Sequence, residues 1–104
     1  MYIAMNRFKV KNGSQDAFET LWKERETRLP EMDGFVEFHL LRGPVDEEAG
    51  NTLYISHTVW ADEGAFRAWT QSQSFRDNHR KGGTGPMLTD GHPRFEGFSA
   101  VEGA

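Results

Sequence analysis

Cysteine is absent from the 104-residue sequence. Its absence excludes a disulfide framework, thiolate catalysis and cysteine-ligated zinc or iron–sulfur centres. Any metal would therefore be held by histidine, by carboxylates or within a bound cofactor. An apolar content of 37% in a chain of this length can bury one modest core, so we expect a single domain over residues 1–104.

The sequence also lacks a hydrophobic run of bilayer-spanning length, and no basic N-terminal segment precedes an apolar one. Its 12 basic residues are scattered among 16 acidic ones, with a net charge of −4, and form no basic stripe. Binding to a phosphate backbone requires such a stripe. The composition therefore argues against nucleic-acid and membrane partners and predicts a cytoplasmic protein.

Aromatic residues, in contrast, are plentiful: the chain has eight Phe, three Trp and two Tyr. Their side chains provide large, flat apolar surfaces. Such surfaces suit either a flat apolar ligand or the core of a small domain, and composition alone leaves both interpretations open.

Hydrophobic periodicity predicts six elements along the chain. Side chains of the first ten residues alternate between two faces, as in a strand. Apolar residues then recur at helical spacing up to Pro30, and Ser14 is a plausible N-cap of this helix. Residues 81–92, rich in glycine, read as a loop. The predicted elements are strands at 2–10, 35–42, 53–60 and 95–101, and helices at about 15–29 and from Asp62 onward, the second continuing past a break at 72–74.

The order β-α-β-β-α-β is typical of the ferredoxin-like α+β fold, in which two helices cover one face of a four-stranded antiparallel sheet. The other face stays uncovered although it carries apolar residues. We therefore expect a homodimer packed sheet to sheet, a dimeric α+β barrel. A charge placed at Val36 or Met5, whichever lies on that face, is expected to dissociate it.

Asn6 is the one amide on an apolar strand face that it shares with Ala4, Phe8 and Val10. Its side chain should point into the space beneath the helices. A buried amide needs hydrogen-bond partners. A neighbouring backbone group, a water molecule or a ligand would each satisfy it, and its position alone does not distinguish them.

Trp69 and His79 lie ten residues apart on the side of the second helical segment that also carries Phe66 and Phe75, so both should face the sheet. A lone histidine there is more often structural than a ligand. His79 nevertheless differs from the other histidines, because it ends a helical segment and a cationic, glycine-containing loop follows at 80–83. The competing histidines are His39, His57 and His92.

Arg25 falls on the apolar stripe of the first helix, at helical spacings from Phe18, Leu21 and Trp22. Its stem can lie on apolar surface while the guanidinium reaches water. Alternatively, the guanidinium can pair with a carboxylate of an otherwise apolar ligand.

Several sequence segments together carry a family pattern. They are Met-Asn-Arg-Phe at 5–8, Gly-Phe-Val-Glu-Phe-His-Leu-Leu-Arg-Gly at 34–43, Thr-Val-Trp at 58–60, Ala-Phe-Arg-Ala-Trp at 65–69 and Ser-Phe-Arg-Asp-Asn-His at 74–79. Over nearly its whole length the chain resembles the IsdG-type heme-degrading monooxygenases of the antibiotic biosynthesis monooxygenase superfamily. The set of Asn6, Trp69 and His79 distinguishes the heme degraders from their relatives.

The resemblance implies that heme is both substrate and cofactor, and that O2 and an external electron donor open the porphyrin ring and release iron. His79 would be the axial ligand of the heme iron, and Asn6 would hydrogen-bond to iron-bound oxygen. Trp69 would press on the porphyrin and distort it. By the same analogy Arg25 would face a heme propionate, while Phe66 and Phe75 would contact the ring.

Two other functions remain open at this stage. A cofactor-independent monooxygenase of polycyclic phenols would use Trp69 and Asn6 to position substrate and oxygen, and would bind no stoichiometric heme. A heme-binding or dimeric stress-response protein would share the pocket but leave the ring closed. The sequence does not identify the physiological reductant or the ring-opened product.

Overall fold

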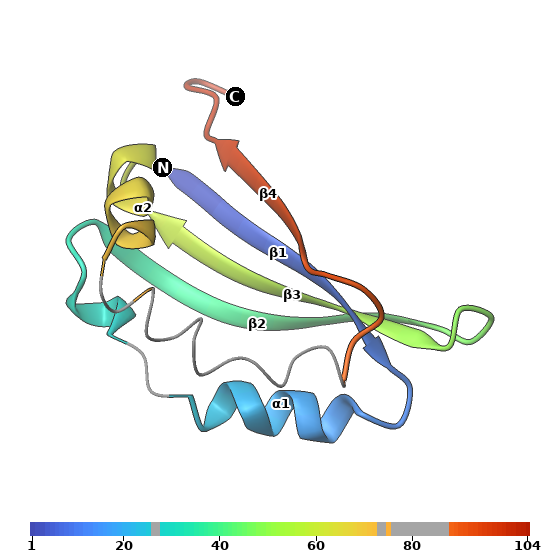
Figure 1. Ribbon diagram of the computed structural model, residues 1–104. Coiled ribbons are helices and arrows are strands. Elements are labelled where there is room, and N and C mark those ends of the chain that lie inside the picture. The colour runs from blue at the N-terminus through green and yellow to red at the C-terminus, as the bar shows by residue number, and fades with distance from the viewer. Residues whose placement is uncertain (26–27, 73–74, 76–87) are drawn as a thin grey trace.

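The computed structural model describes residues 1–25, 28–72, 75 and 88–104. Its strands form one antiparallel sheet in the order β2-β3-β1-β4 (Figure 1). The sheet confirms the predicted ferredoxin-like β-α-β-β-α-β fold, whereas the dimeric barrel stays a prediction. The elements are β1 (Tyr2–Lys11), α1 (Gln15–Lys23), a 3-10 turn η1 (Leu29–Glu31), β2 (Phe35–Asp46), β3 (Asn51–Trp60), α2 (Glu63–Thr70) and β4 (Arg94–Ser99).

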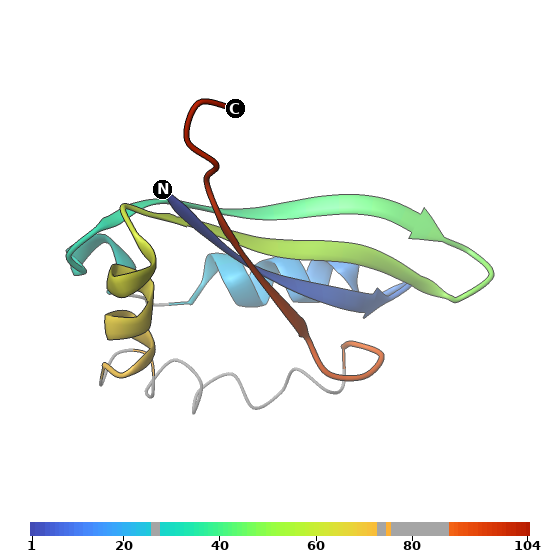
Figure 2. The ribbon, with the colours of Figure 1, turned by 90° about the horizontal axis from the view of Figure 1, so that it is seen from above.

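Both helices lie on the same side of the sheet, with α1 running along it and α2 at one end (Figure 2). Directly paired residues of neighbouring strands share a face. The pairs Tyr2↔Trp60, Asn6↔Ser56 and Val10↔Thr52 therefore place the even-numbered residues of β1 and β3 beneath the helices. We call this the inner face and the opposite one the outer face.

The first helix is shorter than predicted, because α1 ends at Lys23 and not near residue 29. Phe18 of α1 packs in one core cluster, whereas Leu29 packs in another with Tyr2 and Trp60. The chain leaves the helix to reach the second cluster, and Leu29 begins η1. Ser14 occupies the N-cap position, but its hydroxyl makes no capping hydrogen bond, so the predicted cap interaction is wrong.

The second helix begins as predicted, because the Asp62 carboxylate accepts a hydrogen bond from the backbone N–H of Ala65 at 2.8 Å. Its last residue is Thr70. Residues 73, 74 and 76–87 lie outside the described part of the chain, and with them most of the predicted continuation of this helix and of the loop. At the end of that loop Thr89 forms an isolated bridge with Val10.

The central hairpin is longer than predicted, since β2 reaches Asp46 and β3 starts at Asn51. Pairing continues through a register shift between Arg42 and Val45, where the sequence had predicted a loop. Gly43 permits this, because a Cβ there would lie 3.0 Å from the carbonyl oxygen of Leu53. The final strand, 94–99, ends two residues before the predicted limit.

The inner face carries two aromatic core clusters, one at each end of β1. Asn6 lies between them, since Ala4 belongs to the first cluster and Val10 to the second. The helices fix this division: α2 packs on the first cluster and α1 on the second. The first comprises Tyr2, Ala4, Leu29 and Trp60 with Phe66 and Trp69 packed on it, and the second comprises Val10, Phe18 and Tyr54 with Phe8 and Trp22 packed on it.

The outer face carries apolar side chains that no described element covers. Met5 lies on it, because its neighbour Asn6 lies on the inner face, and it pairs with His57. Leu41 and Phe98 are 43% and 48% exposed. Val36 stands at a register shift of β2 and is also exposed. No helix in the described part of the chain combines the length and apolarity needed to cross a membrane.

Candidate functional site

Asn6 lies on the inner face as predicted, between Ser56 of β3 and Phe95 of β4. It is half-buried, and its amide makes no side-chain hydrogen bond to another described residue. Within the described chain the amide is therefore not held by a backbone partner. Its donors and acceptor remain available to a ligand at the seam between the two aromatic clusters.

Trp69 projects from α2 onto the first cluster, with its ring 5.7 Å from that of Trp60 and 4.7 Å from that of Phe75. The contact with Phe75 is edge-on, at 87°. Its indole N–H is buried and has no hydrogen-bond partner among the described residues. A buried donor without a partner costs about 1–3 kcal/mol, so a ligand acceptor at this position would be stabilised. Trp69 thus faces the sheet, as predicted.

Phe66 of α2 extends this aromatic surface toward β4. Its ring stacks on Phe95 at a centroid distance of 5.5 Å and an interplanar angle of 8°. Phe95 is 49% exposed and lies next to Asn6 across the sheet. Sequence reasoning missed Phe95, because only the register between β1 and β4 reveals its proximity to Asn6.

Arg25 lies two residues beyond the end of α1, not within the helix as predicted. Its guanidinium carbon stands 4.4 Å from the centroid of the Trp22 ring. Burial lowers the pKa of Arg25, yet the group stays charged near neutral pH. No described carboxylate forms an ion pair with it. After Asn6 and Trp69, this half-buried cation without an anion is the third unsatisfied group near the inner face that the described residues show.

None of the described histidines lies on the inner face of the sheet. His39 and His57 pair with each other across β2 and β3 on the outer face, away from Asn6. His92 is exposed, just before β4. His79 lies outside the described residues, as does the loop at 80–83. Among the residues that the structure does describe, no three metal-ligating side chains gather at one point.

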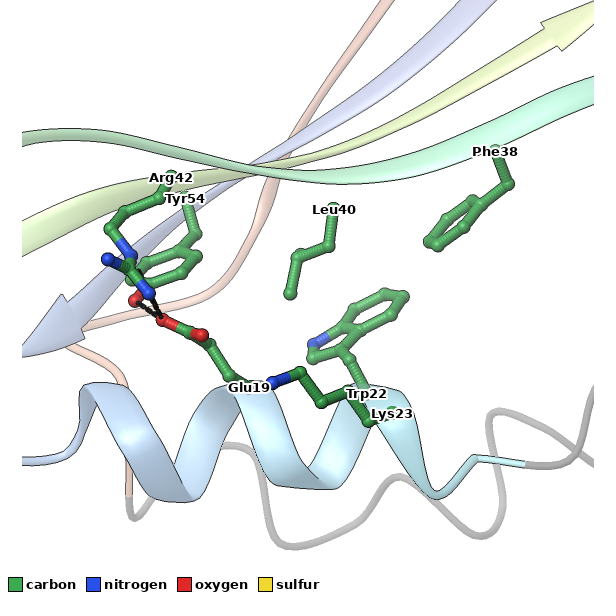
Figure 3. Close-up of a pocket in the computed structure, with 7 residues that line it drawn as sticks. All are labelled: Glu19, Trp22, Lys23, Phe38, Leu40, Arg42 and Tyr54. Carbon is green, nitrogen blue, oxygen red and sulfur yellow. Dashed lines mark hydrogen bonds and ion pairs between the residues drawn. The ribbon is translucent and has the colours of Figure 1, made fainter.

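A separate pocket of about 350 Å³ opens between α1 and the β2–β3 hairpin (Figure 3). At one end the Glu19 carboxylate accepts hydrogen bonds from the Tyr54 hydroxyl at 2.5 Å and from Arg42 Nε at 3.0 Å. The bond from Tyr54, followed by those from Arg42, holds the pKa of Glu19 below its usual range. Nothing in the sequence periodicity predicted this pocket. It is lined by Glu19, Trp22 and Lys23 of α1 and by Phe38, Leu40, Arg42 and Tyr54 of the sheet.

Comparison with known families decides the affiliation of the chain. A family model described as "antibiotic biosynthesis monooxygenase" matches residues 1–81. The chain belongs to the antibiotic biosynthesis monooxygenase family. Residues 1–81 include the strand of Asn6, both helices and the position of His79. The family assignment confirms the coarse expectation from the sequence, without identifying a substrate.

Solved structures of other proteins share the fold of this family member. A putative antibiotic biosynthesis monooxygenase from Bacillus cereus is 18% identical, with a TM-score of 0.75 over 99% of this chain and 95% of that one. The heme degrader MhuD from Mycobacterium tuberculosis, solved with two hemes in its active site, is 24% identical, with a TM-score of 0.74 over 100% and 99%. SnoaB from Streptomyces nogalater, a cofactor-independent oxygenase, is also 24% identical, with a TM-score of 0.69 over 97% and 93%.

Proposed function

We propose that this family member is a heme-degrading monooxygenase, which takes heme as its substrate and opens the ring with O2 and electrons from an external donor. One observation carries the proposal. The amide of Asn6, the indole N–H of Trp69 and the guanidinium of Arg25 all lack partners among the described residues, in surroundings rich in aromatic side chains. A planar apolar ligand with acidic groups at its edge is complementary to such a site.

The residues of the inner face fit a porphyrin. The ring needs flat apolar contacts, which Phe66, Trp69 and Phe75 provide at one end of the sheet. A propionate needs a cation, and Arg25 is desolvated and unpaired among the described residues. Pairing Arg25 with a carboxylate would offset its desolvation.

Each side chain has a distinct role in the proposal. Heme supplies the redox chemistry when bound. Asn6 donates a hydrogen bond toward oxygen as negative charge develops there, and loss of one such donor typically lowers a rate by about a hundredfold. Trp69 limits the space available to the ring, because Trp60 and Phe75 hold its indole from two sides. Distortion of a flat ligand would follow from that confinement.

In this proposal His79 would hold the heme iron. The proposal rests on the family resemblance around residues 74–79 and on the outward position of His39 and His57. Neutral imidazole binds both ferric and ferrous iron. Substituting His79 therefore tests whether the segment beyond α2 contributes to the site.

The outer face is proposed to pair with a second copy of the chain. Leu41 and Phe98 are exposed there without a covering element in the described chain. Apolar residues on a sheet face of this kind favour burial against another surface. The homodimer would leave both inner faces open to ligand.

The heme degrader MhuD and the cofactor-independent oxygenase SnoaB differ in activity, so the decisive experiment is heme titration followed by reduction. We expect about one heme per chain and a histidine-type Soret band that His79→Ala abolishes or strongly shifts. Ascorbate in air, with catalase present, should then bleach the band. Absence of stoichiometric heme would favour cofactor-independent oxygenation of a polycyclic phenol, and binding without bleaching would favour a non-catalytic heme protein.

A further inference from the structure

The pocket between α1 and the β2–β3 hairpin contains none of the residues proposed to act on heme (Figure 3). Its volume of about 350 Å³ is in the range of small-molecule sites. The Trp22 ring lines this pocket, and the Arg25 guanidinium, which is proposed to pair with heme, packs on the same ring. The lining of the pocket is therefore distinct from the set of residues proposed to act on heme.

The walls of the pocket are flat and apolar. The Trp22 indole and the Phe38 ring stack on each other, at an angle of 14° and a centroid distance of 5.7 Å, and together form one flat wall. Leu40 lies between them and the buried ring of Tyr54, as Figure 3 shows. Such walls favour a planar aromatic ligand over an aliphatic chain.

The polar end of the pocket is already ordered. One oxygen of Glu19, Oε2, accepts hydrogen bonds from the Tyr54 hydroxyl and from both Nε and Nη2 of Arg42. Its other oxygen, Oε1, has no hydrogen-bond partner among the described residues. Because the pKa of Glu19 is lowered, this oxygen remains a carboxylate acceptor near neutral pH. A hydroxyl group on a ligand could donate to it.

The charge balance at the rim favours an anion. Glu19 contributes one negative charge, whereas Arg42 and Lys23 contribute two positive ones. Glu19 pairs with Arg42 and also attracts Lys23 electrostatically, but the Lys23 ammonium forms no close ion pair with a carboxylate in the described part of the chain. A carboxylate on the ligand would pair with Lys23.

We propose that this pocket is a second binding site, specific for a small hydroxylated aromatic carboxylic acid. The aromatic ring lies against Trp22, Phe38 and Leu40, the carboxylate pairs with Lys23, and the ring hydroxyl donates to Glu19 Oε1. The site is independent of heme, because it requires neither Asn6 nor Trp69.

The test uses the ligand-free, ¹⁵N-labelled protein, titrated with 3-hydroxybenzoate and followed by NMR. The three tryptophan indole N–H signals report on different places: Trp22 on the pocket, and Trp60 and Trp69 on the first cluster. We expect a saturable shift of the Trp22 signal while the Trp69 signal stays fixed. No saturable shift, or a parallel shift of the Trp69 signal, overturns the proposal.

Two variants and one analogue sharpen the assignment. Lys23→Gln, at an exposed position, should weaken binding about two- to fivefold, as expected for an exposed charge pair. Lys9→Gln, on the outer face, is the matched control and should leave affinity unchanged. Leu40→Trp fills the pocket and should abolish the shift. The neutral 3-hydroxybenzamide should bind more weakly than the acid, and equal binding of the two compounds contradicts the proposal.

Discussion

Two regions of the sheet differ in how their polar side chains are satisfied: the outer face around Arg7 and His39, and the inner face around Asn6 and Arg25. On the outer face Arg7 pairs with Glu96 at 3.3 Å and His39 with Glu37 at 3.4 Å, among exposed aliphatic side chains. Near the inner face Asn6 and Arg25 lack such partners within the described chain. Unsatisfied polar groups among aromatic rings suit a ligand, whereas paired charges among aliphatic groups suit a second protein surface.

The largest expected effect is on the free energy of unfolding, which substitutions on the two faces should change differently. Trp60 is fully buried on the inner face, so Trp60→Ala should lower the free energy of unfolding by about 3–5 kcal/mol. This loss should be the same at every protein concentration. Leu41→Ala should change stability only at concentrations where the dimer forms. Urea unfolding at several concentrations measures both variants, and a concentration-dependent loss for Trp60→Ala would contradict the division.

The next effect concerns assembly. Of the two positions, Met5 is the one that the register places on the outer face, so Met5→Glu should convert the dimer to monomer at micromolar concentration, because an unpaired charge resists burial. Sedimentation equilibrium measures the mass. Thr20→Glu adds the same charge at an exposed position of α1 and is the matched control. If the wild-type protein is a monomer in this assay, the proposed dimer is wrong.

A smaller effect is expected at Arg25. Arg25→Gln should weaken heme binding about ten- to hundredfold, because a hydrogen bond to a charged group contributes about 1.5–3 kcal/mol. Arg28→Gln is the control, since Arg28 is exposed and already faces Glu31 at 3.7 Å. Absorbance titration compares the two variants. If the two variants bind heme with equal affinity, Arg25 does not contact heme and only packs on Trp22.

The smallest effect is the pH dependence of the Glu19 contacts. A lowered pKa in the folded state means that the stabilisation is present above about pH 4.3, the unfolded value, and is lost as the pH falls toward the folded value. The melting temperature of Glu19→Gln should therefore fall furthest below wild type at neutral pH, and the difference should shrink as the pH falls below the unfolded pKa of glutamate. Glu24→Gln, at an exposed carboxylate, should show no such difference. A difference in melting temperature that grows in acid would contradict a lowered pKa of Glu19 in the folded state.

Much of the fold was predictable because the strands obey a simple period. Alternation along residues 2–10 placed Asn6 inward and Met5 outward, and the register confirms both orientations. The end of α1 was not predictable in this way. Leu29 continues the apolar spacing of the helix, yet it packs in the other cluster, and periodicity does not show which cluster a side chain joins.

The candidate site was only partly predictable, for a topological reason. Phe95 lies beside Asn6 only because β4 pairs with β1, and Glu19 meets Arg42 only because α1 crosses the hairpin. These contacts join residues far apart in the chain. The sequence pattern of each element contains no signal for them.

The proposal that the inner face acts on heme is tested most directly by the rate of Soret bleaching in Asn6→Ala. The protein is loaded with heme and reduced with ascorbate in air, with catalase present to remove free peroxide. We expect Asn6→Ala to bind heme with near wild-type affinity and to bleach about a hundredfold more slowly, because the amide acts on developing charge. A wild-type rate in Asn6→Ala would contradict the account and leave Asn6 a structural residue.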